Sequence, residues 1–262
     1  MMPVLDVKAL SKNFGGLRAL NEVDMTIDAG EIVALIGPNG AGKTTFFNCI
    51  TSIYTPTEGT VNFTPLGKER TLVNGMKPNL VTQLGMARTF QNIRLFKNMT
   101  VLENVMIARH CRTKAGILGA LLRPPSVVQE EREIVQRSYD LLKYIGLHKL
   151  YDEQASNLSY GAQRRLEIAR ALATEPSLLL LDEPAAGMNP QETAELVELI
   201  LRIRKEFNVA ILLIEHDMSL VMKLSERIYV MEYGCLISQG TPEEVRKDPR
   251  VIKAYLGEDA HA

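Results

Sequence analysis

Short apolar runs recur along this chain between longer stretches of mixed polarity. Three of them, EIVALIG at 31–37, SLLLLDEP at 177–184 and VAILLIEHD at 209–217, are nearly continuous in apolar residues and end in glycine or charged residues. A run of this length and composition is typical of a strand that is buried on both faces of a sheet. Strands buried in this way are characteristic of parallel sheets covered by helices.

Helical patterns fill the segments between these runs. A helix is expected over about 42–53, and an amphipathic helix is expected to begin at Pro190, because proline is favoured in the first helical turn. From about 98 to 172 the pattern is helical, with a break at RPP, 123–125, since proline interrupts helices. The alternation predicts an α/β fold with a mainly parallel sheet.

The change of pattern along the chain predicts one domain, 1–262, with an internal insertion. Its core is expected over 1–91 and 173–240, its helical subdomain over about 92–172, and a helical tail over about 241–258.

Composition and charge narrow the class of protein. The chain has 262 residues, 46% of them apolar, so it can bury a sizeable core. Its formal net charge of −1 gives no overall attraction to nucleic acid or to an anionic membrane, and no nucleic-acid partner is expected. The three cysteines are widely spaced and predict neither a disulfide framework nor a metal site. No run approaches 18 uninterrupted apolar residues, so a membrane connection would have to go through a partner.

GPNGAGKTT follows the first buried strand and opens a helix, and it satisfies the pattern GxxxxGK[ST]. Main-chain N–H groups of such a loop surround phosphates, Lys43 reaches the β and γ phosphates, and the Thr44 hydroxyl can bind Mg²⁺. The loop predicts phosphate groups and Mg²⁺ as the ligands. Its residues are Gly37, Pro38, Asn39, Gly40, Ala41, Gly42, Lys43, Thr44 and Thr45.

Polar side chains end the other two buried strands. Asp182 is placed to hold Mg²⁺ and Glu183 to act as a general base on an attacking water. His216 lies at the carboxyl end of the third strand, where open α/β sheets bind ligands, and is a candidate contact for the γ-phosphate or the water. Taken alone, a histidine at this position is more often structural.

Further candidates lie outside the strands. Gln91 is a candidate for holding water or Mg²⁺, with an ordinary surface glutamine as the alternative. Phe14 is either an adenine-stacking aromatic or a packed core residue. A second anion-binding helix start occurs at LSYGAQRR, where Ser159 can cap the helix. For the arginines of this helix, Arg164, Arg165 and Arg170, the default interpretation is a solvated face.

The order of these motifs resembles that of the nucleotide-binding subunits of ABC transporters, over nearly the whole chain. GPNGAGKTT resembles the Walker A motif and LLLLDEP the Walker B motif; Gln91 matches the Q-loop, His216 the switch histidine and Phe14 the adenine-stacking aromatic. LSYGAQRR is similar to the signature usually written LSGGQ. The resemblance implies a P-loop ATPase fold that includes an antiparallel β part near the N-terminus.

In that family two ATP-binding domains meet head to tail around two ATP molecules. The resemblance therefore implies that the signature segment, namely Ser159, Tyr160, Gly161 and Gln163, contacts ATP held by the partner. The chain departs from the pattern at Tyr160 and Ala162, and at Asn189, where the family usually has Asp. Loss of that charge is expected to alter communication across the dimer.

The segments around Gln91, Asp182, His216 and the C-terminus resemble the LivG type of ATP-binding subunit, from bacterial branched-chain amino-acid importers. This implies transmembrane permease subunits, a second ABC ATPase in a homo- or heterodimer, a periplasmic substrate-binding protein, and a place at the cytoplasmic face of the inner membrane. The ATPases for urea, amides or other amino acids, and for lipopolysaccharide export, are similar in the same segments. The surface at 91–98 is a candidate for docking a permease helix, and the apolar block at 115–128 either docks a partner or packs internally.

Proteins of three other classes fit the chain less well. A P-loop kinase does not predict the signature or His216, and a chromosome or repair ATPase needs a long coiled-coil insertion. A catalytically silent nucleotide switch would be expected to lack Glu183 or His216, and both residues are present.

Overall fold

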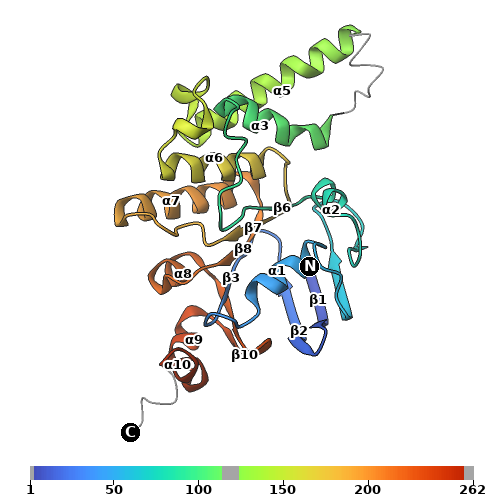
Figure 1. Cartoon of the computed structure of the whole chain (residues 1–262), viewed down its shortest axis with the longest axis vertical. Coiled ribbons are helices and arrows are strands. Elements are labelled where there is room, and N and C mark those ends of the chain that lie inside the picture. Colours follow the sequence, from blue (N-terminus) through green and yellow to red (C-terminus); the bar gives the residue numbers. More distant parts are fainter. Residues whose placement is uncertain (1–2, 114–123, 257–262) are drawn as a thin grey trace. The chain divides into compact units, whose positions relative to one another are not determined.

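The computed structural model describes residues 3–113 and 124–256, which fall into two compact units. Unit 1 is formed by Met1–Met86 and Ser177–Ala262, and unit 2 by Ala87–Pro176 (Figure 1). Unit 1 contains two sheets with helices around them, whereas unit 2 is helical.

An antiparallel sheet forms the N-terminal part of unit 1. Its strands pair in the order β2-β1-β4-β5. They are β1 (Leu5–Phe14), β2 (Leu17–Ile27), β4 (Glu58–Phe63) and β5 (Thr71–Leu72). The apolar residues of β1 and β2 alternate with polar ones, so one face of this sheet is buried and the other is exposed.

The second sheet of unit 1 is mainly parallel and contains the three predicted buried strands. Neighbouring strands follow the order β10-β9-β3-β8-β7. They are β3 (Ile32–Ile36), β7 (Leu178–Asp182), β8 (Ala210–Ile214), β9 (Arg227–Glu232) and β10 (Cys235–Gly240). Every residue of β3, β7 and β8 is buried. Because β7 and β3 are both parallel to β8, the residues that follow these strands emerge at one edge. The short strand β6 (Met86–Arg88) leads the chain from unit 1 into unit 2.

Six helices belong to the described part of unit 1. They are α1 (Lys43–Ile50), α2 (Pro78–Leu84), α7 (Pro190–Phe207), α8 (Met218–Leu224), α9 (Pro242–Lys247) and α10 (Pro249–Leu256). The predicted start of α7 at Pro190 is confirmed, and the Asn189 side chain caps that helix by accepting from the Glu192 N–H at 3.0 Å.

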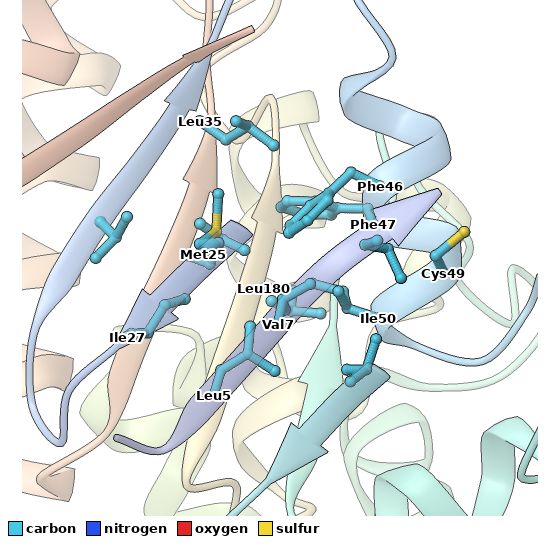
Figure 2. Packing of buried hydrophobic residues seen from close by; sticks show 14 of the residues in the cluster. Leu5, Val7, Met25, Ile27, Leu35, Phe46, Phe47, Cys49, Ile50 and Leu180 are labelled. Atoms are coloured by element: carbon cyan, nitrogen blue, oxygen red, sulfur yellow. The ribbon is translucent and has the colours of Figure 1, made fainter. Parts of the chain in front are cut away.

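Helix α1 joins the two sheets of unit 1 through a shared apolar core. Phe46 and Phe47 are fully buried and lie against side chains from both sheets, as Figure 2 shows. Their neighbours include Val7 of β1, Met25 of β2 and Leu180 of β7. Burying each ring contributes about 1.5–3 kcal/mol of transfer free energy. The helix that begins at the glycine-rich loop is therefore held rigidly in the core.

Unit 2 consists of three α-helices and three short 3₁₀ helices among its described residues. They are α3 (Val101–Arg109), η1 (His110–Arg112), α5 (Pro125–Tyr144), η2 (His148–Leu150), η3 (Ala155–Asn157) and α6 (Tyr160–Leu172). The predicted break at 123–125 is confirmed at its C-terminal side, because α5 begins at Pro125. Most of the apolar block at 115–128 lies outside the described residues.

Among the helices that the structure describes, none is both long enough and apolar enough to cross a bilayer.

Candidate active site

The glycine-rich loop leaves β3 in a backbone conformation that only glycine adopts easily. Gly37 has a φ of 150°, and a Cβ atom at this position would overlap the main-chain oxygen of Met231. Gly42, with a φ of 101°, would place a Cβ atom 2.8 Å from the main-chain oxygen of Ala19. The two glycines therefore let the loop turn sharply while it stays packed against β9 and β2.

The loop ends in a helix start that suits an anion. Helix α1 has no side-chain cap and no acidic residue in its first turn, and Asn39 and Gly40 are exposed at the tip of the loop. The unpaired N–H groups of a helix start and the positive end of the helix dipole attract phosphate. Thr44, in the first turn, is exposed, whereas Thr45 is half-buried.

Lys43 folds back over the loop. Its Nζ donates to the main-chain oxygens of Gly37 at 2.6 Å and Pro38 at 3.0 Å, and only 7% of the residue is exposed. Burial lowers the pKa of Lys43, while the negative charges of Glu183 and Asp182 raise it. The ammonium group therefore lies close enough to both carboxylates to interact with them electrostatically, as expected for a lysine that binds phosphate beside candidate catalytic acids.

The two acids after β7 differ in burial and in backbone conformation. Asp182 ends the strand, pairs in register with Ile214 of β8 and is buried. Glu183 has a φ of 47°, a left-handed conformation that is rare for this residue type and costs about 1–3 kcal/mol. Its main-chain N–H donates to the Ile214 oxygen at 2.9 Å. Strained residues of this kind are typical of functional sites.

His216 faces Glu183. The distance from His216 Nε2 to Glu183 Oε1 is 2.8 Å, and 42% of the His216 side chain is exposed, so this histidine is not buried. When Glu183 is ionised, Nε2 carries a hydrogen and donates it to the carboxylate. The structure thus brings together a candidate base and its partner at the edge where Lys43 lies.

A buried glutamate, Glu215, lies beneath this pair and was not recognised in the sequence. Its Oε1 accepts from the Ala185 N–H at 2.8 Å and its Oε2 from the His216 N–H at 3.0 Å. Burial raises the pKa of Glu215, the main-chain N–H groups of Ala185, His216 and Asp217 lower it, and the charge of Glu183 raises it. The sequence signal for it was an acid within an otherwise apolar strand end.

Phe14 lies at the end of β1 and is 42% exposed, which excludes the alternative of a packed core aromatic. Its ring meets the Tyr54 ring edge to face, with centroids 5.3 Å apart, and Lys12 Nζ lies 5.1 Å from the Phe14 centroid. A ring that is exposed and packed only along its edge leaves a flat face on which a nucleotide base can stack.

The remaining predicted site residues belong to unit 2. Ser159 caps α6, since its Oγ accepts from the Ala162 N–H at 3.4 Å, and Tyr160 is exposed beside it. Gly161 is buried, and Gln163 Nε2 donates to the main-chain oxygen of Leu158 at 2.9 Å. A serine hydroxyl that accepts at a cap can still donate its own proton to an anion.

The default interpretation of Arg164 as part of a solvated face is wrong. The residue is 0% exposed, and its guanidinium donates to the main-chain oxygens of Phe90 at 2.7 Å and Gln91 at 2.9 Å. It also pairs with Glu167 Oε2 at 2.8 Å. Glu167 in turn accepts from the Phe90 N–H at 3.2 Å. Arg164 therefore anchors the main chain at Gln91 to α6. Gln91 itself is exposed.

The other two arginines of α6 are half-buried, and Arg170 is also not simply solvated. Its guanidinium lies 5.0 Å from the Phe96 ring centroid and donates to the main-chain oxygen of Arg94. Arg164 and Arg170 thus both hold the main chain between Phe90 and Arg94.

Tyr255, in α10, is a further contact that the sequence did not reveal. Burial raises the pKa of the Tyr255 hydroxyl, and a hydrogen bond from the Gly37 main chain lowers it. The last described helix therefore reaches the first residue of the glycine-rich loop.

The sequence of this chain matches two models of known protein families. The ABC transporter family model matches residues 20–186, more than half of the chain. A second model, described as branched-chain amino acid ATP-binding cassette transporter, matches residues 235–261.

Individual relatives agree with the family models. The chain is 51% identical to the high-affinity branched-chain amino acid transport ATP-binding protein LivG of Salmonella typhimurium, over 98% of each protein. It is 32% identical to a crystallised ATP-binding cassette of an ABC transporter in its ADP conformation, with a TM-score of 0.83 over 98% of this chain and 100% of that one. A dimeric cassette bound to ADP and Pi is 26% identical, with a TM-score of 0.74 over 91% of this chain and 98% of that one.

Proposed function

The chain belongs to the ABC transporter ATP-binding proteins, and from that premise we propose how its residues turn ATP hydrolysis into transport. It is the ATPase subunit of a branched-chain amino acid importer, for leucine, isoleucine and valine. The observation that carries the catalytic assignment is the contact of His216 with Glu183 at the sheet edge where Lys43 lies.

Residues of unit 1 bind ATP and prepare water for attack. The main chain of the glycine-rich loop and Lys43 hold the β and γ phosphates, and Phe14 stacks on adenine. Glu183 takes a proton from water as the water oxygen attacks the γ-phosphorus, and the bond from that phosphorus to the β–γ bridging oxygen breaks. His216 holds the Glu183 carboxylate in place and reaches the γ-phosphate.

Magnesium fits the residues that the site offers. Among the described residues no three His, Cys, Asp or Glu side chains gather into a metal cluster. Mg²⁺ needs none, because it is usually held by one or two protein oxygens together with phosphates and waters. Asp182 and the Thr44 hydroxyl would supply those oxygens, and the ion would neutralise phosphate charge.

The signature segment acts on ATP held by a second ATP-binding subunit. The start of α6 carries an exposed serine that has a proton to donate, and a similar cassette is known as a dimer with ADP and Pi. Ser159, Tyr160, Gly161 and Gln163 contact the γ-phosphate across the interface. ATP thus joins two subunits, and hydrolysis releases them.

The remaining partners follow from the transporter class. Two permease subunits cross the membrane and dock on the surface at 91–98, and a periplasmic binding protein delivers the amino acid. The second ATPase is another copy of this chain or a related subunit. The chain lies at the cytoplasmic face of the plasma membrane.

Uptake of labelled leucine in cells that lack the gene tests the cargo. We expect the intact chain to restore uptake and the Glu183→Gln variant to fail, because only hydrolysis resets the transporter. Restoration of uptake by the Glu183→Gln variant as well as by the intact chain would exclude Glu183 as the general base. If neither affects leucine uptake while the protein still hydrolyses ATP, the cargo assignment is wrong, and urea, amides, other amino acids and exported lipopolysaccharide are tested next.

Replacing Ser159 by arginine should impair the ATP-bound dimer while ATP binding to the single chain survives. The arginine fills the space of the γ-phosphate at the interface, whereas the loop that binds ATP belongs to unit 1. Light scattering with and without ATP, in a background that cannot hydrolyse ATP, measures the dimer. Arg132→Met, at an exposed position of α5, is the control. Unchanged dimerisation of the Ser159→Arg variant would contradict the role of Ser159 across the interface.

A further inference from the structure

The Glu215 carboxylate joins two catalytic segments that are far apart in the sequence. Its Oε1 accepts from the Ala185 N–H, two residues after Glu183, and its Oε2 from the His216 N–H. The two segments are separated by 30 positions and meet only because β7 and β8 are neighbours in the sheet. Each carboxylate oxygen thus fixes the backbone beside one of the two catalytic residues.

The position of this carboxylate is unusual because Glu215 is only 4% exposed. A buried charge is costly unless its oxygens are hydrogen-bonded, and in the described part of the chain its partners are main-chain N–H groups rather than a cation. An apolar or neutral side chain would be the less costly choice for packing alone. The carboxylate instead satisfies main-chain N–H donors in two segments, which an apolar side chain could not do.

What it holds is a strained turn. Glu183 adopts a φ of 47°, and such conformations persist only where the surroundings over-determine them. The turn is fixed before Ala185 by the hydrogen bond from the Glu183 N–H to the Ile214 oxygen. The bond from Ala185 to Glu215 fixes it on the other side. The same carboxylate fixes the main chain of His216, whose ring meets Glu183 at 2.8 Å.

We infer that Glu215 is a positioning residue of the ATPase. It fixes the position of the Glu183 carboxylate relative to the His216 ring by accepting hydrogen bonds from the main chain of both segments. The inference rests on the proposed function, because it takes Glu183 as the general base. Glu215 touches neither ATP nor water in this role. It also ties the main chain at Ala185 to that at His216.

The Glu215→Gln variant separates positioning from binding. An amide keeps the shape, but its NH₂ group must face one of the two N–H donors, so one bond is lost. We expect kcat of the full-length protein to fall by about 10- to 100-fold, the size of loss that a misplacement of about 1 Å produces. ATP affinity, measured with a fluorescent analogue, should stay nearly unchanged because the glycine-rich loop is not altered. A kcat equal to that of the unaltered protein would overturn the inference.

A matched control and a double variant exclude a merely structural effect. Glu226 also accepts from a main-chain N–H, that of Ile32 at 3.3 Å, but at the start of the strands rather than at the catalytic edge. Glu226→Gln should leave kcat unchanged. Because Glu215 acts through Glu183, adding Glu215→Gln to Glu183→Gln should cause no further loss of rate. A further loss in the double variant would show an independent role and contradict the inference.

Two further measurements keep the test decisive. If Glu215→Gln does not fold, Glu215→Asp keeps the charge but is too short to reach both segments, and the same fall in kcat is expected. If Glu183→Gln leaves the ATPase rate unaltered, the proposed role of Glu183 as the general base fails, and with it the premise of this inference. If Glu183→Gln abolishes turnover while both Glu215 variants are fully active, only the inference about Glu215 fails.

Discussion

Replacing Glu183 by glutamine should lower ATP turnover by about 10²- to 10⁴-fold, the usual contribution of a general base. Glutamine keeps the size of the side chain and its contact with His216, but it cannot take a proton from water. ATP binding should persist, because Lys43 and the glycine-rich loop are unchanged. Steady-state phosphate release and equilibrium binding of a fluorescent ATP analogue measure the two effects separately.

The control for this variant is Glu206→Gln, an exposed residue in the last turn of α7. It makes the same chemical change in unit 1 away from the sheet edge, and it should leave turnover unaltered. Turnover of the Glu183→Gln protein close to that of the unaltered chain would assign the base to another residue.

Replacing Gly37 by alanine should destabilise unit 1 and abolish ATP binding together. The new Cβ atom overlaps the main-chain oxygen of Met231, and the residue has a φ of 150°. Steric overlap and backbone strain together cost about 3–5 kcal/mol, a large part of the stability of an ordinary domain. Thermal unfolding with and without ATP measures both losses.

Gly67 provides the matched control, since its φ is 69° but no atom lies within 4 Å of the Cβ position. Gly67→Ala therefore introduces left-handed strain without overlap, and should lower stability by only about 1 kcal/mol. Equal losses in the two variants would show that strain, not contact with Met231, explains the effect at Gly37.

Elements marked by a pattern of neighbouring residues could be predicted from the sequence. Continuous apolar runs identified β3, β7 and β8, and the polar residues that follow them pointed to the sheet edge where the candidate site lies. A buried strand or a glycine-rich loop is determined by residues that are close together in the sequence, so its pattern can be read directly from the sequence. Helix α2 was missed because its seven residues are too few to show a helical period.

The missed residues all act through contacts between distant positions. Arg164 bonds to main-chain atoms 73 and 74 positions away, and arginine is usually exposed, so the default interpretation followed the average behaviour. A sequence signal was present, since Arg164 and Glu167 lie three residues apart on one side of α6. Glu215 and Tyr255 likewise bond to main-chain groups that no side-chain pattern marks.

The burial of Arg164 has a mechanical consequence. The guanidinium bonds the backbone of Phe90 and Gln91 to the first turns of α6, and Arg170, nearly two turns further along, bonds that of Arg94. A force that displaces this loop would therefore act directly on α6 through these two arginines. The same helix begins at Ser159, so the loop and the capping serine are joined through α6.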